Sequence, residues 1–106
     1  MTTSADETTV ARNEKAGRYE IHVGDVLAGF ADYKIDSHER VSFPHTEIDP
    51  AFAGRGLAKL LVRDAMADSA ARNDTVVPHC PFVEKYLKRN PVEGLEVVWP
   101  DEPHPE

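Results

Sequence analysis

The feature that most constrains this chain is a run of three strand-like segments joined by short polar turns. Residues 18–23 (RYEIHV) alternate polar and apolar side chains, which is the pattern of a strand with one buried face. Gly24-Asp25 predicts a tight turn, after which residues 26–35 predict a second strand and residues 41–48 a third. A chain that reverses twice at such short turns forms an antiparallel meander.

The second half of the chain alternates helix and strand signals. Residues 57–73 place apolar side chains one turn apart on one face, which predicts an amphipathic helix. Residues 75–78 predict a short buried strand, residues 81–91 a second helix and residues 95–99 a final strand. The predicted order is β-β-β-α-β-α-β, an α/β (α+β) fold with a mixed, mostly antiparallel sheet and two main helices.

Length and composition indicate one small domain with loose ends. A chain of 106 residues suffices for one self-standing core. Residues 17–99 carry the predicted elements and form this single domain. Residues 1–16 are mostly polar and residues 100–106 are acidic and rich in proline, so both are expected to be flexible.

Charge and cysteine content limit the partners that we expect. The 19 acidic and 12 basic residues give a net charge of −7, which argues against nucleic acid and weakly favours a cationic substrate. Cys80 is the only cysteine, so no intrachain disulfide can form. No apolar run approaches the roughly 20 residues of a membrane span, and the N-terminus lacks a secretion-signal pattern. We expect a cytoplasmic protein; the oligomeric state stays open.

Two glycines stand at the start of the longer predicted helix, in AGRGLA (residues 53–58). The first N–H groups of a helix lack intrahelical acceptors and carry partial positive charge, so an anion placed there receives several donors. Gly54 and Gly56 carry no side chain that would hold a ligand away, and Arg55 and Lys59 add positive charge. The pattern predicts a phosphate-binding turn, although glycine pairs also occur in turns that only redirect the chain.

AGRGLA resembles the pyrophosphate-binding loop of the GNAT acetyltransferases, whose pattern is Gln/Arg-x-x-Gly-x-Gly/Ala. Gly56 and Ala58 take the fourth and sixth positions, and Ala53 stands where Gln or Arg is usual. The similarity covers residues 18–99 and includes two further motifs of a minimal GNAT branch, His-Thr-Glu at 45–47 and Cys-Pro-Phe at 80–82.

This resemblance implies a minimal GNAT fold, acetyl-CoA as cosubstrate and acetyl transfer to a small or protein-borne primary amine. The residues that it implies for coenzyme A binding are Ile48, Gly54, Arg55, Gly56, Leu57, Ala58 and Lys59. The alternatives are a coenzyme A or acyl-CoA binding module without turnover and an interaction domain that keeps only the fold. Ala53 and the missing N-terminal helices, which shape the acceptor pocket in larger GNAT enzymes, favour these alternatives.

Three residues are catalytic candidates. Cys80 would accept an acetyl group covalently or give a proton to the leaving thiolate, or it is a small core residue. His45 and Glu47 lie two apart on a predicted strand and so share a face, where they form either a base for the amine proton or an exposed polar pair. His79 is an alternative partner of Cys80. These cysteine and histidine positions lack the spacing of a zinc site, so no metal is expected.

The second predicted helix carries further candidates. Tyr86 stands where larger GNAT enzymes often hold a general acid, but a half-buried aromatic that packs on the sheet is the preferred interpretation. Lys85, Lys88 and Arg89 would meet the 3′-phosphate of coenzyme A or form an ordinary solvated face. Pro44, which cannot donate to a strand ladder, predicts a bulge or an edge in the third strand.

Overall fold

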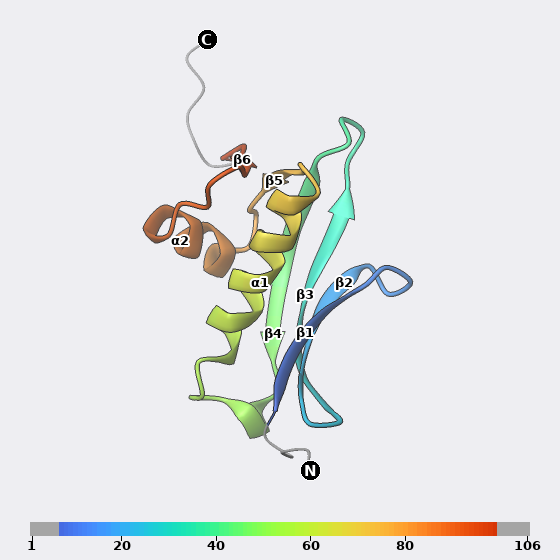
Figure 1. The fold of residues 1–106 in the computed structure, drawn as a ribbon, viewed down its shortest axis with the longest axis vertical. Coiled ribbons are helices and arrows are strands. Elements are labelled where there is room, and N and C mark those ends of the chain that lie inside the picture. Colours follow the sequence, from blue (N-terminus) through green and yellow to red (C-terminus); the bar gives the residue numbers. More distant parts are fainter. Residues whose placement is uncertain (1–6, 100–106) are drawn as a thin grey trace.

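The computed structural model describes residues 7–99 as a six-stranded sheet with two helices (Figure 1). The strands follow one another in the sheet in chain order; β1 to β4 are antiparallel, and β4, β5 and β6 are parallel. The elements are β1 (Thr8–Asn13), β2 (Arg18–Val23), β3 (Val26–Ile35), β4 (Val41–Ile48), η1 (Pro50–Phe52), α1 (Leu57–Ala71), β5 (Thr75–Val77), α2 (Pro81–Arg89) and β6 (Glu96–Val97). The predicted mixed α/β fold is confirmed.

The observed order contains one strand more than the sequence predicts. Residues 8–13 form β1, which pairs with β2 from Thr8↔Val23 to Asn13↔Arg18. The prediction that residues 1–16 are a flexible lead-in is therefore wrong over this stretch. Most side chains of β1 are exposed or half-buried, so the strand leaves no clear alternation in the sequence. Residues 1–6, and the tail predicted over 100–106, lie outside the described residues.

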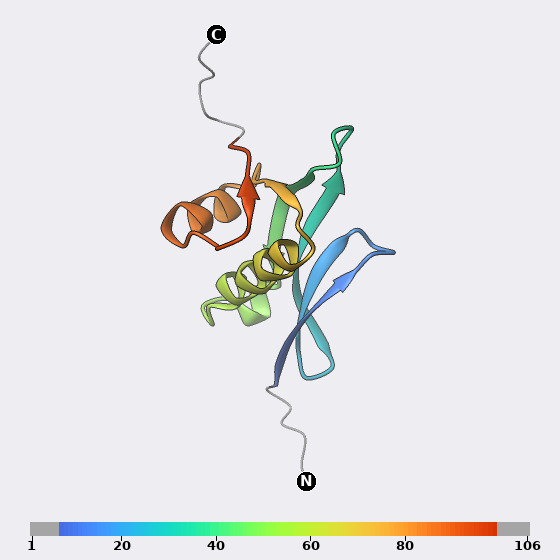
Figure 2. The same ribbon diagram turned by 45° about the horizontal axis from the view of Figure 1, so that its top comes forward.

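The core lies between α1 and the concave face of the sheet. Helix α1 crosses this face and contacts β1 to β5, as the turned view shows (Figure 2). Each large apolar side chain that is fully buried in this core stabilises the folded state by roughly 1.5–3 kcal/mol. The buried positions of α1 are Leu57, Leu61, Val62, Ala65, Met66 and Ser69, and the largest sheet residues against them are Tyr19, Ile21, Val41 and Phe43. Within residues 7–99, neither helix is long and apolar enough to cross a membrane.

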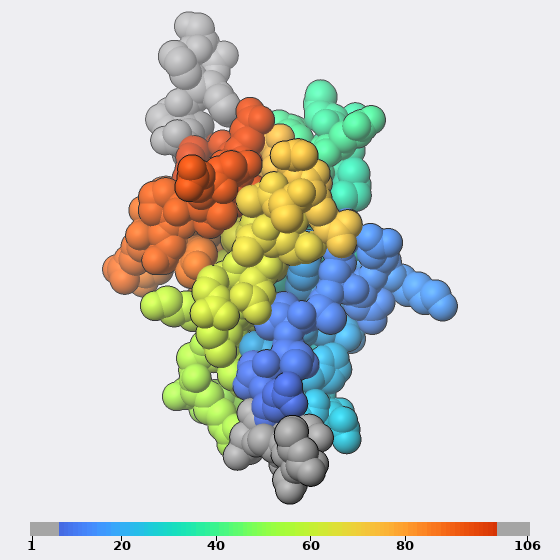
Figure 3. Space-filling view, in the orientation of Figure 1, coloured from blue at the N-terminus to red at the C-terminus, as the bar shows by residue number. Residues whose placement is uncertain are grey.

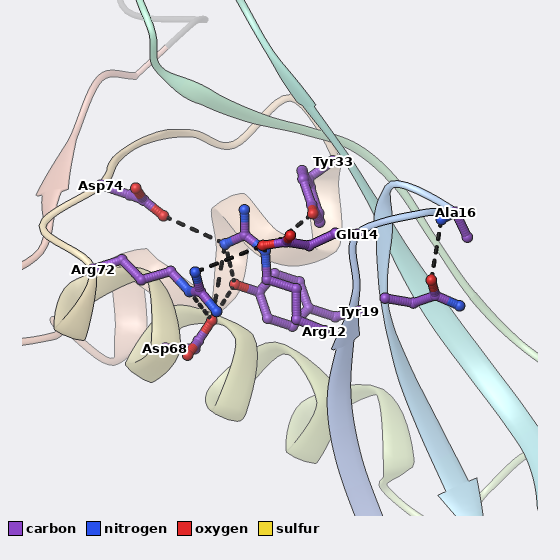
Figure 4. A network of polar contacts seen from close by, with 9 residues as sticks. Arg12, Glu14, Ala16, Tyr19, Tyr33, Asp68, Arg72 and Asp74 are labelled. Carbon is purple, nitrogen blue, oxygen red and sulfur yellow. Dashed lines mark hydrogen bonds and ion pairs between the residues drawn. The ribbon is translucent and has the colours of Figure 1, made fainter.

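A polar network fastens the C-terminal half of α1 to the first strands (Figure 4). The Tyr19 hydroxyl donates a hydrogen bond to Asp68 Oδ2 over 2.7 Å, and Arg72 Nε donates to the same oxygen over 2.7 Å. Arg12 Nε donates to the Tyr33 hydroxyl over 3.0 Å, and a second Arg12 nitrogen donates to the Tyr19 hydroxyl over 3.2 Å. The network thus joins β1, β2 and β3 to the helix.

These contacts shift the pKa values of the groups that make them. Burial, together with the hydrogen bond to Asp68, raises the pKa of Tyr19 above its ordinary value. Burial alone would raise the pKa of Asp68, but the hydrogen bonds from Tyr19 and Arg72 outweigh it and hold that pKa below its ordinary value. The network therefore favours the neutral phenol and the ionised carboxylate.

Candidate functional site

The turn before α1 leaves the start of the helix bare. Asp49 begins η1 by accepting a hydrogen bond from the Ala51 N–H over 2.8 Å. Gly54 and Gly56 then take φ values of +82° and +73°, a left-handed region that strongly favours glycine. Gly56 is the N-cap of α1, and no side chain of the described residues caps the helix. Its first N–H groups therefore remain available to a ligand.

A groove of about 460 Å³ runs along this turn. A Cβ atom at Gly54 or Gly56 would meet nothing within 4 Å, so both glycines border open space. The groove is lined by Ile48, Phe52, Ala53, Gly54, Gly56, Leu57, Ala58, Lys59 and Phe82. It therefore brings together every residue predicted for coenzyme A binding except Arg55, whose guanidinium lies over the Phe52 ring at 5.2 Å on the same turn.

The sheet opens beside this groove. Strand β5 pairs with β4 only at Val41↔Val76 and Ser42↔Val77, and the chain then leaves the sheet. The pairing of β3 with β4 passes from Asp32↔His45 to Lys34↔Ser42, so β4 holds one extra residue between Ser42 and His45. This is the bulge that Pro44 predicts, and the prediction is confirmed. Beyond it, β4 continues to Ile48 with no strand paired on its β5 side among the described residues.

The main chain of β4 faces this opening at alternate residues. The Asp49 N–H donates to the Ala28 carbonyl over 2.7 Å, which makes Gly29↔Ile48 a pair without mutual hydrogen bonds. The alternation of the ladder then directs the main-chain groups of Thr46 and Ile48 away from β3. Gly29 permits this close pairing, since a Cβ there would lie 2.5 Å from the Glu47 carbonyl oxygen.

Cys80 lies at the opening and contacts a residue that the sequence did not single out. It is the N-cap of α2, it is 6% exposed, and its N–H donates to the Phe43 carbonyl over 2.8 Å. Its thiol donates to Thr46 Oγ1 over 3.5 Å. Thr46 is the middle residue of the His-Thr-Glu motif. Strand alternation could have identified it, because this residue faces away from the two outer ones.

His45 and Glu47 lie on the other face of β4. His45 Nε2 and Glu47 Oε1 are 3.0 Å apart, which confirms that the two side chains share a face, and their side chains are 54% and 57% exposed. The His45 ring also lies 6.1 Å from the ring of Phe30. The structure therefore pairs His45 with Glu47 and Cys80 with Thr46, on opposite faces of one strand. His79 is exposed, whereas Cys80 beside it is buried.

Helix α2 forms a wall beyond the glycine turn, and both lie on the same side of α1 (Figure 3). Tyr86 is half-buried and packs against the core, which agrees with the preferred interpretation. Lys88 pairs with Glu84 over 3.5 Å and lies over Trp99, away from the groove. Over residues 7–99, no three His, Cys, Asp or Glu side chains gather in a way that would hold a metal ion.

An opened mixed sheet, with a bare glycine-capped helix beside the opening, defines an α/β domain of the minimal GNAT type. Residues 18–96 match the family of GCN5-related N-acetyl-transferases, and the chain belongs to this family. It is 35% identical over 69 residues to Protein NATD1 of Xenopus tropicalis, a match that spans 64% of this chain and 63% of that protein. It is 34% identical over 61 residues to Protein NATD1 of Homo sapiens, a match that spans 57% of this chain and 54% of the human protein. The match thus covers less than two thirds of each relative.

Proposed function

We propose that this protein is an N-acetyltransferase that uses acetyl-CoA to acetylate a primary amine. The observation that carries the proposal is the bare, glycine-capped start of α1, whose groove ends at Ile48, on the strand that opens beside Cys80. Members of the family generally use acetyl-CoA and an amine acceptor. Acetyl-CoA would supply an activated thioester, and the chain's own residues would bind it, hold the amine and move protons.

The residues at the turn fit the diphosphate of the coenzyme. The free N–H groups at the start of α1 are suitable donors for it, and Gly54 and Gly56 leave room at the backbone. Arg55 and Lys59 add exposed positive charge. The main-chain groups of Thr46 and Ile48 are suited to hold the pantetheine arm as an added strand would be held. A β4 N–H group at the opening would polarise the thioester carbonyl.

The two pairs of side chains on β4 suit the two proton transfers of the reaction. Cys80, with its thiol ordered by Thr46, would give a proton to the departing thiolate. With Glu47 Oε1 beside its Nε2, His45 would keep a proton on Nε2 and take the amine proton at Nδ1, directly or through water. The acidic net charge of −7 suits an acceptor that arrives as a cation.

Binding and turnover are tested separately. Acetyl-CoA at 100 times its dissociation constant should stabilise the protein by about 2.7 kcal/mol in a thermal or urea titration. The amide NMR signals of Gly54, Arg55 and Gly56 should move in the same titration. Unmoved signals at millimolar acetyl-CoA would overturn the proposal and leave an interaction domain.

Turnover is measured against a panel of polyamines, amino sugars, amino acids and lysine peptides. We expect His45→Gln to lower kcat, while the affinity for acetyl-CoA stays unchanged. We expect Cys80→Ala to slow the reaction; an unchanged rate would remove Cys80 from the chemistry, and an acetylated cysteine in the mass spectrum would make it a nucleophile. Binding without turnover of any amine would identify a coenzyme A binding module, which Ala53 favours.

A further inference from the structure

A small hollow lies on the face of β4 that carries His45 and Glu47. Its volume is about 120 Å³. Two residues of its lining, Phe30 and Glu47, also contact His45: the Phe30 ring lies 6.1 Å from the His45 ring, and Glu47 Oε1 lies 3.0 Å from His45 Nε2. The hollow therefore adjoins the side chain that would take the proton of the acceptor amine.

The hollow combines apolar walls with carboxylates. Leu27, Phe30 and Pro50 form apolar walls, and Leu27 is 37% exposed although it is a large apolar residue. Within residues 7–99, Glu47 and Asp49 are the only charged residues that line the hollow. Such a surface suits a cation that carries methylene groups, because the methylene chain packs on the walls while the charge meets the carboxylates.

Each of the two carboxylates keeps one oxygen available to a ligand. Asp49 uses Oδ1 to accept a hydrogen bond from the Ala51 N–H over 2.8 Å, and Glu47 uses Oε1 in its contact with His45. In the described part of the chain, the second oxygen of each carboxylate has no hydrogen-bond partner. Both side chains are exposed, so either one alone would hold a cation only weakly, and the apolar walls have to add to the attraction.

One guanidinium lies beside the hollow, and its charge is already compensated. Arg18 lies over the Phe30 ring at 4.6 Å and pairs with Glu20 over 2.8 Å. The hydrogen bond from Arg18 holds the pKa of Glu20 below its ordinary value, so this carboxylate stays ionised beside the arginine. The guanidinium thus supports the Phe30 ring without occupying Glu47 or Asp49.

The geometry of β4 sets the distance between the hollow and the candidate base. Each strand residue adds about 3.3 Å, so residues 47 and 49 lie roughly 7 and 13 Å along the chain from His45. A cation held between these two carboxylates would therefore lie on the order of 7–13 Å from the reacting amine. An extended chain of about five to nine methylene groups spans this distance.

We infer that the acceptor is a diamine or polyamine whose second ammonium group binds between Glu47 and Asp49. Its methylene chain contacts Leu27 and Phe30, and its first amine reaches His45. This inference rests on the proposed function, which it deepens by naming the class of acceptor. Its consequence is selection by length and charge: a monoamine brings no second cation to the hollow, and 1,3-diaminopropane is too short to reach it.

The first test compares amines at saturating acetyl-CoA. For 1,8-diaminooctane, kcat/KM per reacting amine should be about tenfold that of octylamine, because only the diamine brings a cation to the two carboxylates. 1,3-Diaminopropane should lose this advantage. Equal values for 1,8-diaminooctane and octylamine would overturn the inference and leave the proposed function intact. A lysine peptide that outperforms every diamine would overturn it in favour of a protein-borne acceptor.

The second test removes one charge from the hollow. Asp49→Asn keeps a side-chain oxygen for the Ala51 N–H, so the turn should fold as before. KM for 1,8-diaminooctane should rise about fivefold, while kcat and the values for octylamine stay unchanged. Glu93→Gln is the matched control, because it removes the same charge from an exposed residue that lies outside the hollow. An equal rise of KM in the control would show a general charge effect and overturn the inference.

The third test measures amine binding without turnover. In the absence of acetyl-CoA, millimolar 1,8-diaminooctane should shift the amide NMR signals of Gly29, Phe30 and Asp49, and octylamine should shift them less. If these shifts occur but no amine is acetylated, the proposed function fails and the cation site stands. If amines are acetylated but the diamine moves these signals no more than octylamine does, the proposed function stands and the inference is overturned.

Discussion

The two ends of α1 are built in opposite ways. Toward its C-terminus, Asp68 accepts hydrogen bonds from Tyr19 of β2 and from Arg72, and Arg12 of β1 links Tyr19 to Tyr33 of β3. At its N-terminus, Gly56 has no side chain, no side chain within residues 7–99 caps the first turn, and a groove borders it. Along one helix the protein thus separates the contacts that stabilise the fold from the groups kept available for a ligand.

This separation has a physical reason. A helix start whose N–H groups were satisfied by a capping side chain would lose the donors that an anion needs. With glycine at the N-cap, leaving them bare costs only about a few tenths of a kcal/mol relative to a good side-chain cap. The buried face of α1 and the polar network at its far end offset this cost, because they hold the helix without using its first turn.

The largest expected effect comes from breaking the polar network at the C-terminal end of α1. Arg12→Met should lower the free energy of unfolding by about 2–3 kcal/mol, because it leaves two tyrosine hydroxyls and nearby carboxylates without their shared cation. Urea denaturation measures this, and the affinity for acetyl-CoA should stay within about twofold. Arg63→Met is the control: within the part of the chain that the structure describes, Arg63 pairs only with its neighbour Asp64, and its loss should change stability by less than about 0.5 kcal/mol.

The next largest effect is expected at the N-terminus of α1, where a substitution should change both stability and coenzyme A binding. Gly56→Ala should cost about 1–2 kcal/mol, because φ is +73° there, and should also weaken coenzyme A binding by at least about tenfold, because a methyl group enters the groove. Gly94→Ala is matched to it, with φ of +84° and equally open surroundings away from the turn. It should cost the same stability and leave binding unchanged; equal binding losses in both variants would contradict the assignment of the turn.

A smaller loss of stability is expected from Tyr19→Phe, which tests whether Tyr19 and Arg12 act together. Tyr19→Phe removes one hydroxyl between Arg12 and Asp68 and should cost about 1 kcal/mol. Combined with Arg12→Met, the loss should be less than additive, because both variants remove the same hydrogen bond. Additive losses would show that the two residues act independently. Tyr86→Phe, in which the lost hydroxyl has no described hydrogen bond, serves as the control in the same urea titrations.

The smallest expected effect is the pH dependence that Asp68, in the polar network, gives to the free energy of unfolding. The folded pKa of Asp68 is depressed, so its contribution to stability is present above the ordinary pKa of about 4 and is lost as the pH falls through the folded pKa. Wild-type stability should therefore fall more steeply below pH 5 than that of Asp68→Asn. Parallel curves for the wild type and Asp68→Asn would contradict the sign.

Much of the fold was predictable because local pattern and packing agree. The strands over residues 18–23, 26–35 and 41–48 have the predicted bounds, since each alternates or carries apolar residues that the core buries. The helix predicted over 57–73 ends two residues earlier, at Ala71, and Asn73 beyond it takes a positive φ. Strand β1 was missed, because an edge strand with polar side chains is held by main-chain pairing and by one arginine in the network.

The candidate site, like the fold, could be predicted only in part. The glycine turn and its cations could be predicted, because a helix start and two glycines separated by one residue are local features. The contact of Cys80 with Thr46 and the separation of Cys80 from His45 could not be predicted, because they depend on where the start of α2 lies relative to β4.

By itself, the sequence determined most of the elements, though not β1, and also the turn that leaves a helix start bare and the charges near that turn. These are properties of short segments, governed by backbone freedom, periodicity and helix termini. Only the tertiary structure decided that β4 opens beside Cys80, and that His45 and Cys80 lie on opposite faces of β4. These depend on contacts between residues far apart in the chain, whose relative placement is set when the core packs.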